Sequence, residues 1–228
     1  MSFRQLHSVI ESVAASDGAG VKLRRSLGRS QHLRFDPFLM LDEFVSDDPD
    51  DYLAGFPAHP HRGFGTVTYM LDGHVRHEDS LGNRGDLGPG DVQWMTAARG
   101  IVHSEMPQQS EGRIRGFQLW INLPAREKMK PAAYRDIPSD EIPTAALPQR
   151  AAGLLTAGDA VRIRAGEAGV KLLLLASRPI GEPVVQYGPF VMNTAAEIQQ
   201  AIADYQSGRL GREGDGRARV ANSTIAAV

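Results

Sequence analysis

The sequence predicts an all-β fold of the jelly-roll or small-barrel type, because short runs of strand-forming residues recur along the chain with turn residues between them. The chain has 228 residues, and its 24 glycines and 14 prolines return at short intervals. Glycine and proline supply the backbone conformations that turns need, so this spacing is typical of many short antiparallel strands. The length leaves room for one large or two small domains.

Composition excludes several classes of protein. Hydrophobic residues make up 42% of the chain and charged residues 23%, as in ordinary soluble globular proteins. A formal net charge of -2 argues against direct nucleic-acid binding through a basic surface. The chain has no cysteine, which excludes disulfides, Fe–S clusters and thiolate catalysis. The absence of cysteine also fits the cytoplasm, where we expect the protein to reside.

Targeting and membrane segments are not expected. The first residues lack the apolar core of a signal peptide. The longest aliphatic cluster, Leu172–Ala176, is far shorter than the ~18–20 apolar residues that cross a bilayer. We therefore expect a soluble protein with no membrane partner.

Two strands are expected before the central region, at Val21–Arg25 and Phe38–Phe44. The acidic run Asp47–Asp51 follows the second of them. Carboxylate clusters of this kind are most often exposed, so we interpret the run as a solvated turn, with cation binding as the less favoured alternative.

Five strands are expected in the central region, where β-branched and aromatic residues are frequent and turn residues divide them. Asp72-Gly73 is a good hairpin turn, so the strand after it is expected to return beside the strand before it. The five strands are expected at Thr66–Leu71, His74–Asp79, Val92–Thr96, Ile101–Met106 and Arg113–Leu123.

The alternation of strand and turn residues is less clear after Pro124. Prolines punctuate Lys128–Pro148, which we interpret as a loop or crossover. Short strands are expected at Val161–Arg164 and Lys171–Ala176. The tail, residues 211–228, has too little apolar periodicity to pack and is expected to be loose.

One helix is expected, over Thr194–Gln206. Asn193 or Thr194 can cap its first turn, and Gly208 follows as a stop signal. An apolar stripe at helical spacing predicts the buried face, consisting of Ala195, Ile198, Ala201, Ile202 and Tyr205.

Two short pairs of metal-binding residue types stand out in the central region: His59-Pro60-His61 and His103-Ser104-Glu105. Side chains two residues apart on a strand point to the same face, so each pair can present two donors to one point. If the two strands sit opposite each other in a barrel, three imidazoles and one carboxylate converge. That set suits a divalent ion such as Fe(II), Mn(II), Ni(II), Cu(II) or Zn(II).

A single His-x-His pair is weak evidence of a metal site, because histidines also cluster by chance. The second pair, on a different strand with the same spacing, favours the metal site over histidines that merely fill the core. His74 and His77 are three residues apart and face opposite sides of a strand, which favours surface or supporting roles. His7 and His32 have no nearby partner and are interpreted as structural.

Such a site would keep open coordination positions. Four protein ligands leave up to two of six octahedral positions vacant, which is the mark of a catalytic rather than a structural metal site. Glu105 has a second candidate role, because a carboxylate at the metal can accept a proton from a substrate hydroxyl.

The chain resembles the pirin family, a branch of the cupin superfamily, over most of residues 20–208. The resemblance is carried by a series of motifs: HPHRGF (59–64), TYMLDG (68–73), HEDS (77–80), PGDVQWMTA (89–97), GIVHSEMP (100–107), QLWINLP (118–124) and GEPVVQYGPFVMNT (181–194).

The resemblance implies a fold, a metal and two kinds of activity. It places His59, His61, His103 and Glu105 on the family's metal-ligand positions, with Fe(II) as the implied metal. The implied fold is a bicupin, two jelly-roll domains in tandem. Known activities in the family include the oxygen-dependent opening of flavonols such as quercetin. Other members are regulatory partners of transcription factors or metabolic enzymes.

One departure from the family lies at position 65, where this chain has Gly and the family usually has Glu. A carboxylate near a metal site helps to orient ligands or to take up protons. Since the four ligand positions are intact, we expect the change to alter metal affinity or catalysis rather than to abolish binding.

A second departure is the short C-terminal part. Only 69 residues separate Ala125 from Asn193, counting both, whereas a jelly roll of ~8 short strands needs roughly 80–100. We expect residues 1–124 to form a metal-binding cupin domain and residues 125–210 a shortened, incomplete cupin-like domain, followed by the tail. The deletion is expected between Pro148 and Ala160. The exposed strand edges would be covered by the N-terminal segment, by the helix or by a partner chain, and a homodimer that exchanges strands is one such arrangement.

The leading hypothesis is a metal-dependent dioxygenase that binds O2 and a small aromatic substrate such as a flavonol. Gln118 and Trp120 share one face of their strand and are expected to line the pocket; if Phe117 faces inward instead, that assignment reverses. The alternatives are a non-catalytic metal-binding regulator that contacts another protein, which Gly65 and the short C-terminal part favour, and a metal-free cupin.

Overall fold

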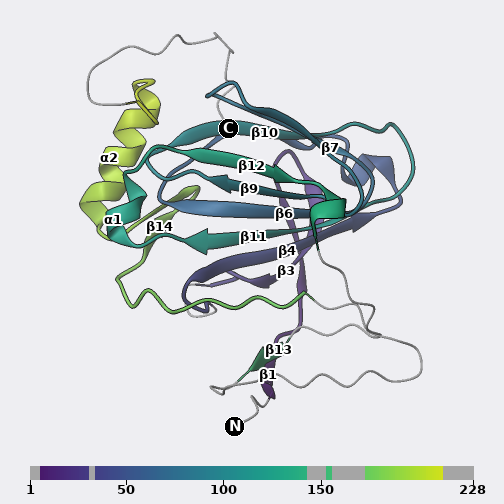
Figure 1. Cartoon of the computed structure of the whole chain (residues 1–228), viewed down its shortest axis with the longest axis horizontal. Coiled ribbons are helices and arrows are strands. Elements are labelled where there is room, and N and C mark those ends of the chain that lie inside the picture. Colours follow the sequence, from purple (N-terminus) through teal and green to yellow (C-terminus); the bar gives the residue numbers. More distant parts are fainter. Residues whose placement is uncertain (1–5, 31–33, 143–152, 156–172, 213–228) are drawn as a thin grey trace.

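Two antiparallel β-sheets form the body of the protein in the computed structural model, which describes residues 6–30, 34–142, 153–155 and 173–212. The larger sheet runs in the spatial order β12 (Ala133–Ile137), β9 (Val92–Thr96), β6 (Phe64–Asp72), β11 (Ile114–Asn122), β4 (Phe38–Ser46), β3 (Val21–Leu27) and β2 (Val13–Asp17) (Figure 1). The smaller sheet runs in the order β5 (Phe56–His61), β10 (Ile101–Pro107), β7 (Val75–Asp79) and β8 (Arg84–Leu87).

The core lies between these two sheets. Its largest cluster combines side chains of the larger sheet, such as Phe44, Met70 and Ile114, with Val75 and Leu87 of the smaller sheet. All five are less than a tenth exposed, and burial of each such side chain contributes about 1.5–3 kcal/mol to folding. The predicted all-β, jelly-roll fold of the cupin type is therefore confirmed.

The predicted hairpin at Asp72-Gly73 is wrong. The turn does form, with Gly73 at a φ of +81°, but β7 pairs with β10 and β8 instead of returning beside β6. Strands β9 and β11 occupy both edges of β6, so the turn carries the chain from the larger sheet to the smaller one. A turn sequence specifies a reversal of the chain, and it leaves the partner strand open.

The segment after Pro124, which includes the predicted loop Lys128–Pro148, contains structure that the sequence did not indicate. It holds the short helix α1 (Ala125–Lys128), the strand β12 and a 3-10 turn, η2 (Ser139–Glu141). Strand β12 pairs with β9 along its whole length. As an edge strand between prolines it buries little apolar surface, so its own sequence pattern is weak and its backbone hydrogen bonds to β9 define it.

Of the other predictions, one is confirmed, several are untested and one is wrong. The acidic run is a surface turn that includes η1 (Pro49–Asp51). The N-terminal strand β1 (Leu6–Val9) pairs with β13 (Gly153–Leu155). The predicted strand Val161–Arg164 lies outside the described residues, as do His32 and the tail from residue 213. In the predicted strand Lys171–Ala176, the described residues, from Leu173 on, do not form a strand.

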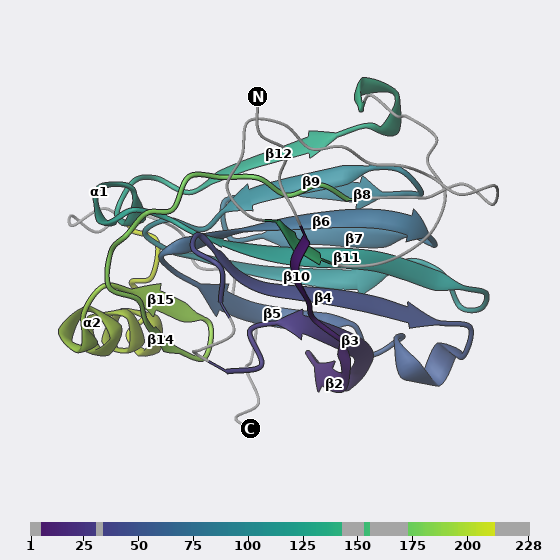
Figure 2. The same cartoon turned by 90° about the horizontal axis from the view of Figure 1, so that it is seen from below.

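The C-terminal helix is confirmed as α2 (Ala195–Gln206). Figure 2 shows it beside the hairpin of β14 (Val185–Tyr187) and β15 (Phe190–Met192), at one end of the sheets. Thr194 caps it in a reciprocal arrangement: the Thr194 hydroxyl accepts from the backbone N–H of Glu197, and the Glu197 carboxylate accepts from that of Thr194. Ile198 and Ala201 are buried against β15 as predicted, whereas Ala195 is exposed. Among the described residues, no helix has the length and apolar character needed to span a membrane.

Candidate metal centre

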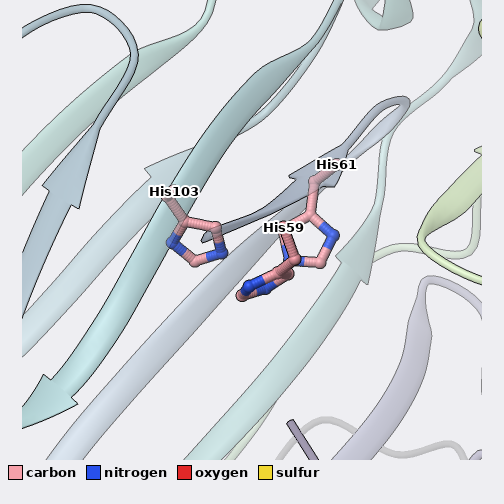
Figure 3. Close-up of side chains that lie close together, drawn as sticks. All are labelled: His59, His61 and His103. Carbon is pink, nitrogen blue, oxygen red and sulfur yellow. The ribbon is translucent and has the colours of Figure 1, made fainter. Parts of the chain in front are cut away.

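The two predicted ligand pairs lie on neighbouring strands of the smaller sheet. Strand β5 carries His59 and His61, and strand β10 carries His103 and Glu105. The strands are hydrogen-bonded side by side, with His103 directly across from His59, and do not face each other across the barrel as expected. Adjacency brings the side chains on one face of the two strands together, and Figure 3 shows the three imidazoles turned toward one another.

The three imidazoles are close enough to share one ion. Each offers a ring nitrogen, and these nitrogens all lie within 4.8 Å of one another. The Nε2 atoms of His59 and His61 are 3.0 Å apart. Two imidazole nitrogens at right angles on one metal, each about 2.1 Å from it, would lie about 3 Å apart. The spacing of His59 and His61 therefore fits two neighbouring ligands of a single ion.

Burial keeps two of the imidazoles neutral. His61 and His103 are each 2% exposed, while His59 is partly exposed. Burial lowers the pKa of His61 well below its usual value, and repulsion between the protonated rings of His61 and His59 would lower it further. Burial, followed by the same repulsion between His103 and His61, likewise lowers the pKa of His103. Neutral imidazole is the form that binds metal, because its unprotonated nitrogen carries a free lone pair.

Two ring nitrogens in the cluster are available to a bound ion. His59 Nδ1 lies 2.8 Å from the carbonyl oxygen of Pro57, which can only accept, so the ring hydrogen is on Nδ1 and Nε2 carries a lone pair. His103 Nε2 is buried and has no hydrogen-bond partner among the described residues. An unpaired buried acceptor is unfavourable, and a bound cation would satisfy it. The donor set therefore fits a divalent metal ion.

Glu105 follows His103 by two residues on β10 and is not a member of the three-imidazole cluster. Its carboxylate is 4% exposed. One oxygen accepts from the hydroxyl of Thr68 at 3.0 Å and the other from the amide of Gln118 at 2.8 Å. Each carboxylate oxygen has a further lone pair, so these bonds are compatible with a ligand role. The role of Glu105 as fourth ligand stays a prediction.

The inner face of β11 is the one that carries Gln118 and Trp120. Gln118 reaches Glu105, and the indole N–H of Trp120 donates to the Gln118 side-chain oxygen at 3.3 Å. The centre of the Trp120 ring lies 5.2 Å from that of His61. The alternative assignment, with Phe117 facing inward, is therefore excluded.

Two further histidines lie where their spacing predicts. His74 is exposed. His77 is fully buried, and its Nδ1 lies 3.3 Å from Nδ1 of His103. His77 is thus behind a predicted ligand and is not a member of the three-imidazole cluster.

The family difference at position 65 falls on β6, at the edge of β9. A Cβ at Gly65 would lie 3.0 Å from the backbone oxygen of Met95, a close contact that β9 would have to relieve by a small shift. Gly65 therefore lets β9 approach β6 closely at this point.

Residues from the C-terminal part of the chain contact the end of β5, the strand that carries His59 and His61. The sequence analysis did not predict these contacts. Arg62, next to His61, is 3% exposed. Its guanidinium forms an ion pair with Asp204 of α2 at 2.8 Å and donates to the carbonyl of Arg99 at 2.6 Å. The backbone N–H of Val191 in β15 donates to the carbonyl of Arg62 at 3.0 Å. The motif at residues 181–194 was the only sequence signal that these elements belong beside the site.

A buried lysine completes this junction. Lys128 is 1% exposed, and its ammonium donates to the carbonyls of Gly63 and Val191 and to the side-chain oxygen of Asn122, at 2.6 to 2.9 Å. Burial lowers the pKa of Lys128 to about 8. The three acceptors are all neutral, so they solvate the ammonium in place of water.

Comparison with known proteins gives matches over nearly the whole chain. The model of the family described as "Pirin" matches residues 20–121, and that of the "Pirin C-terminal cupin domain" matches residues 123–211. A Pseudomonas aeruginosa protein named "Putative quercetin 2,3-dioxygenase" is 45% identical, with 86% of this chain and 94% of that protein covered. A "Pirin-like protein" of Caulobacter vibrioides is 42% identical, with 92% of this chain and all of that protein covered.

A solved structure agrees with these sequence matches. The crystal structure of a quercetin 2,3-dioxygenase from Acinetobacter baumannii superposes with a TM-score of 0.70 at 25% identity, covering 92% of this chain and 99% of that one. The match to the Pseudomonas aeruginosa relative spans 268 positions, more than the 228 residues of this chain. That relative therefore has residues where this chain has a gap.

Proposed function

Because this chain belongs to the pirin family, we propose that it is a metal-dependent dioxygenase that opens a flavonol such as quercetin with O2. The observation that carries the proposal is the cluster of His59, His61 and His103, with a buried nitrogen of His103 that has no hydrogen-bond partner among the described residues. Relatives and a structural neighbour with quercetin dioxygenase in their names support the choice of reaction.

The three histidines would hold the metal, with Glu105 as the fourth ligand. Fe(II) is the favoured ion for oxygen chemistry at such a site, and Mn(II), Ni(II), Cu(II) and Zn(II) are alternatives for the same ligands. A bound ion would supply a Lewis acid for the vicinal oxygens of the flavonol and an open position for O2. Imidazole ligands carry no charge, so only Glu105 would reduce the charge of the ion.

Glu105 is suited to take up the proton of a substrate hydroxyl. Thr68 and Gln118 hold its carboxylate in one orientation from the larger sheet, and a fixed orientation favours proton transfer. Both groups donate to Glu105, so the two carboxylate oxygens are held as acceptors.

The flavonol would reach the metal from the side of His59. The cavity beside Glu105 in the core, between Val75, Ile114 and Gln118, has a volume of about 20 Å³. This is room for about one water molecule, whereas pockets for drug-sized ligands measure about 300–1,000 Å³. His59 is the one partly exposed member of the cluster, so the aromatic substrate would approach there.

Turnover of quercetin tests the proposal. The purified protein is loaded anaerobically with Fe(II), mixed with quercetin and O2, and followed by oxygen uptake and loss of flavonol absorbance. We expect turnover in the parent and none in the His61→Ala variant, with the exposed His74→Ala variant as matched control. A metal-loaded parent that consumes neither quercetin nor O2 would overturn the dioxygenase proposal.

A non-catalytic metal-binding regulator is the second candidate. Gly65, in place of the family carboxylate, and the gap relative to the 268-position match favour it. Such a protein would bind the ion through the same histidines but leave quercetin unchanged. Stoichiometric metal without turnover, combined with metal-dependent capture of a protein partner, would support this reading over the enzyme.

A further inference from the structure

A buried chain of polar groups runs from the metal cluster into the smaller sheet. His103 Nδ1 lies 3.3 Å from Nδ1 of His77, and Nε2 of His77 lies 3.3 Å from a carboxylate oxygen of Asp79. The side chains of His77 and Asp79 are both 0% exposed. Strand register creates the chain, because β7 runs beside β10 with Asp79 directly across from His103.

The carboxylate of Asp79 is fixed as an acceptor. Its Oδ1 accepts from the backbone N–H groups of Leu81 and Asn83, at 2.8 and 3.0 Å. Its Oδ2 accepts from the side-chain amide of Asn83 at 2.8 Å, besides facing His77. All of these partners other than His77 are obligate donors, so Asp79 accepts in each bond and a ring hydrogen of His77 must point at it.

The acceptor role of Asp79 determines the position of the ring hydrogen in His77 and then in His103. A neutral imidazole has a single N–H, so if His77 donates to Asp79 from Nε2, its Nδ1 is an acceptor. The neighbouring Nδ1 of His103 must then carry the hydrogen of that ring. Nε2 of His103 is left with a bare lone pair, and this is the buried atom without a hydrogen-bond partner among the described residues. In Figure 3 one ring nitrogen of His103 points toward His59 and His61.

We propose that Asp79 and His77 are positioning residues that hold His103 in the tautomer with hydrogen on Nδ1, so that Nε2 is ready to bind a metal ion. The inference rests on the proposed metal site, since it assigns His103 as a ligand. Ligating histidines commonly bond a carboxylate or carbonyl through their second nitrogen. Here the bond is relayed through a second imidazole.

The plane of the relaying ring is held by the strand that the sequence did not predict. Tyr134 of β12 stacks on His77, with ring centres 4.6 Å apart and an angle of 28°. The Tyr134 hydroxyl donates to Asp136 and accepts from the amide of Gln93. These bonds fix Tyr134, and Tyr134 in turn limits rotation of His77 away from His103.

The tautomer of His103 can be measured without metal. In the metal-free parent labelled with 15N-histidine, long-range 1H–15N correlation spectra are expected to show hydrogen on Nδ1 of His103 and an unprotonated Nε2. Hydrogen on Nε2 of His103 in the parent would overturn the proposal by itself, and this reading does not depend on any variant folding.

Two variants are expected to change the tautomer of His103, each in a specific way. In Asp79→Asn the two backbone donors hold the remaining oxygen, so the amide nitrogen faces His77 and donates to its Nε2. His77 must then donate from Nδ1, and the hydrogen of His103 is expected to move to Nε2. In His77→Phe, which keeps a ring against Tyr134, His103 loses its fixed partner and should populate both tautomers. The exposed His74→Phe variant is the matched control and should leave His103 unchanged.

Zn(II) titration by calorimetry gives the second readout. Loss of a supporting residue of this kind weakens metal affinity by about 10- to 100-fold, which we expect for Asp79→Asn and His77→Phe. Unchanged tautomer and unchanged affinity in both folded variants would overturn the relay. If the tautomers shift as expected but even the parent fails to bind Zn(II), Fe(II) or Ni(II), the relay stands and the proposed metal-dependent function fails.

Discussion

The Nε2 atoms of His59 and His61 lie 3.0 Å apart, although a proline separates the two residues in sequence. The strand conformation places both on one face of β5, and pairing with β10 adds His103 to the same point. Backbone geometry thereby brings together three ring nitrogens that could hold one metal ion. Five measurements follow from this arrangement and from the contacts around it.

Metal binding should be visible in the fluorescence of Trp120. The chain has two tryptophans, so a Trp94→Phe background leaves Trp120, whose ring lies 5.2 Å from that of His61. We expect Ni(II) to quench this emission with one-to-one stoichiometry and a chelator to restore it. Quenching should disappear when His61→Ala is added and persist when the exposed His74→Ala is added. Equal quenching in both would mean that Ni(II) binds elsewhere.

Glu105 should matter more for turnover than for metal retention. Glu105→Gln removes the proposed base and keeps the shape of the side chain, so we expect flavonol turnover to fall by about 10²–10⁴-fold. Three imidazoles remain, so the variant should still bind the ion, with weaker affinity. Parallel kcat measurements and metal titrations check this. Full activity in the variant would show that Glu105 is not the base of the reaction.

The buried Lys128 should stabilise the fold even though it carries a charge into the core. Lys128→Met leaves three oxygen acceptors without their donor, and each unsatisfied buried group costs about 1–3 kcal/mol. We expect the free energy of unfolding in urea to fall by about 3–5 kcal/mol, as when one partner of a buried charge is removed. Lys130→Met, at an exposed ion pair with Glu127, is the control and should change it by less than about 1 kcal/mol. A stable Lys128→Met protein would show that these oxygens find other donors.

The ion pair between Arg62 and Asp204 should anchor α2 beside the site. Asp204→Asn leaves the buried guanidinium without its counter-charge, and such losses cost about 3–5 kcal/mol. We expect a lower urea midpoint together with faster amide exchange in α2. Glu141→Gln, which removes an exposed partner of Arg135, serves as control. Unchanged exchange in α2 would show that apolar contacts alone hold the helix.

Acid should destabilise the metal-free protein below about pH 6.5. Burial lowers the pKa of His61 and His103 in the folded state, while in the unfolded state both titrate near 6.5. Between the folded and unfolded values the unfolded chain binds more protons, so the stabilisation is present above pH 6.5 and is lost as the pH falls. Each group can contribute a slope of up to about 1.4 kcal/mol per pH unit.

Urea midpoints of the metal-free protein at pH 8, 7, 6 and 5 measure this slope. The slope should be smaller in His61→Leu, which has one buried imidazole fewer. A midpoint that does not change between pH 8 and 5, or a slope that His61→Leu leaves intact, would contradict the assignment.

Local features of the fold were readable from sequence. Alternation along a strand depends only on neighbouring residues, so the positions of several strands and the shared face of His59 and His61 could be predicted. The inward face of Gln118 was one of two alternatives that the sequence left open. The cap and end of α2 are equally local, because Thr194, Glu197 and Gly208 act within one or two turns. The family motifs added the prediction that these positions are metal ligands.

Features that depend on which strands pair with each other could not be predicted from local sequence. The sequence alone determined that two pairs of ligand-type residues lie on one face of their strands, and that one amphipathic helix closes the described chain. Only the tertiary structure decided that β5 and β10 are neighbours, that β7 leaves β6 for the other sheet, and that β12 exists. It also decided that His77 stands behind His103 and that Arg62 meets Asp204, 142 residues away. The physical reason is that alternation and capping act over a few residues, whereas the choice of pairing partner depends on which strand edges remain free once the whole sheet is built.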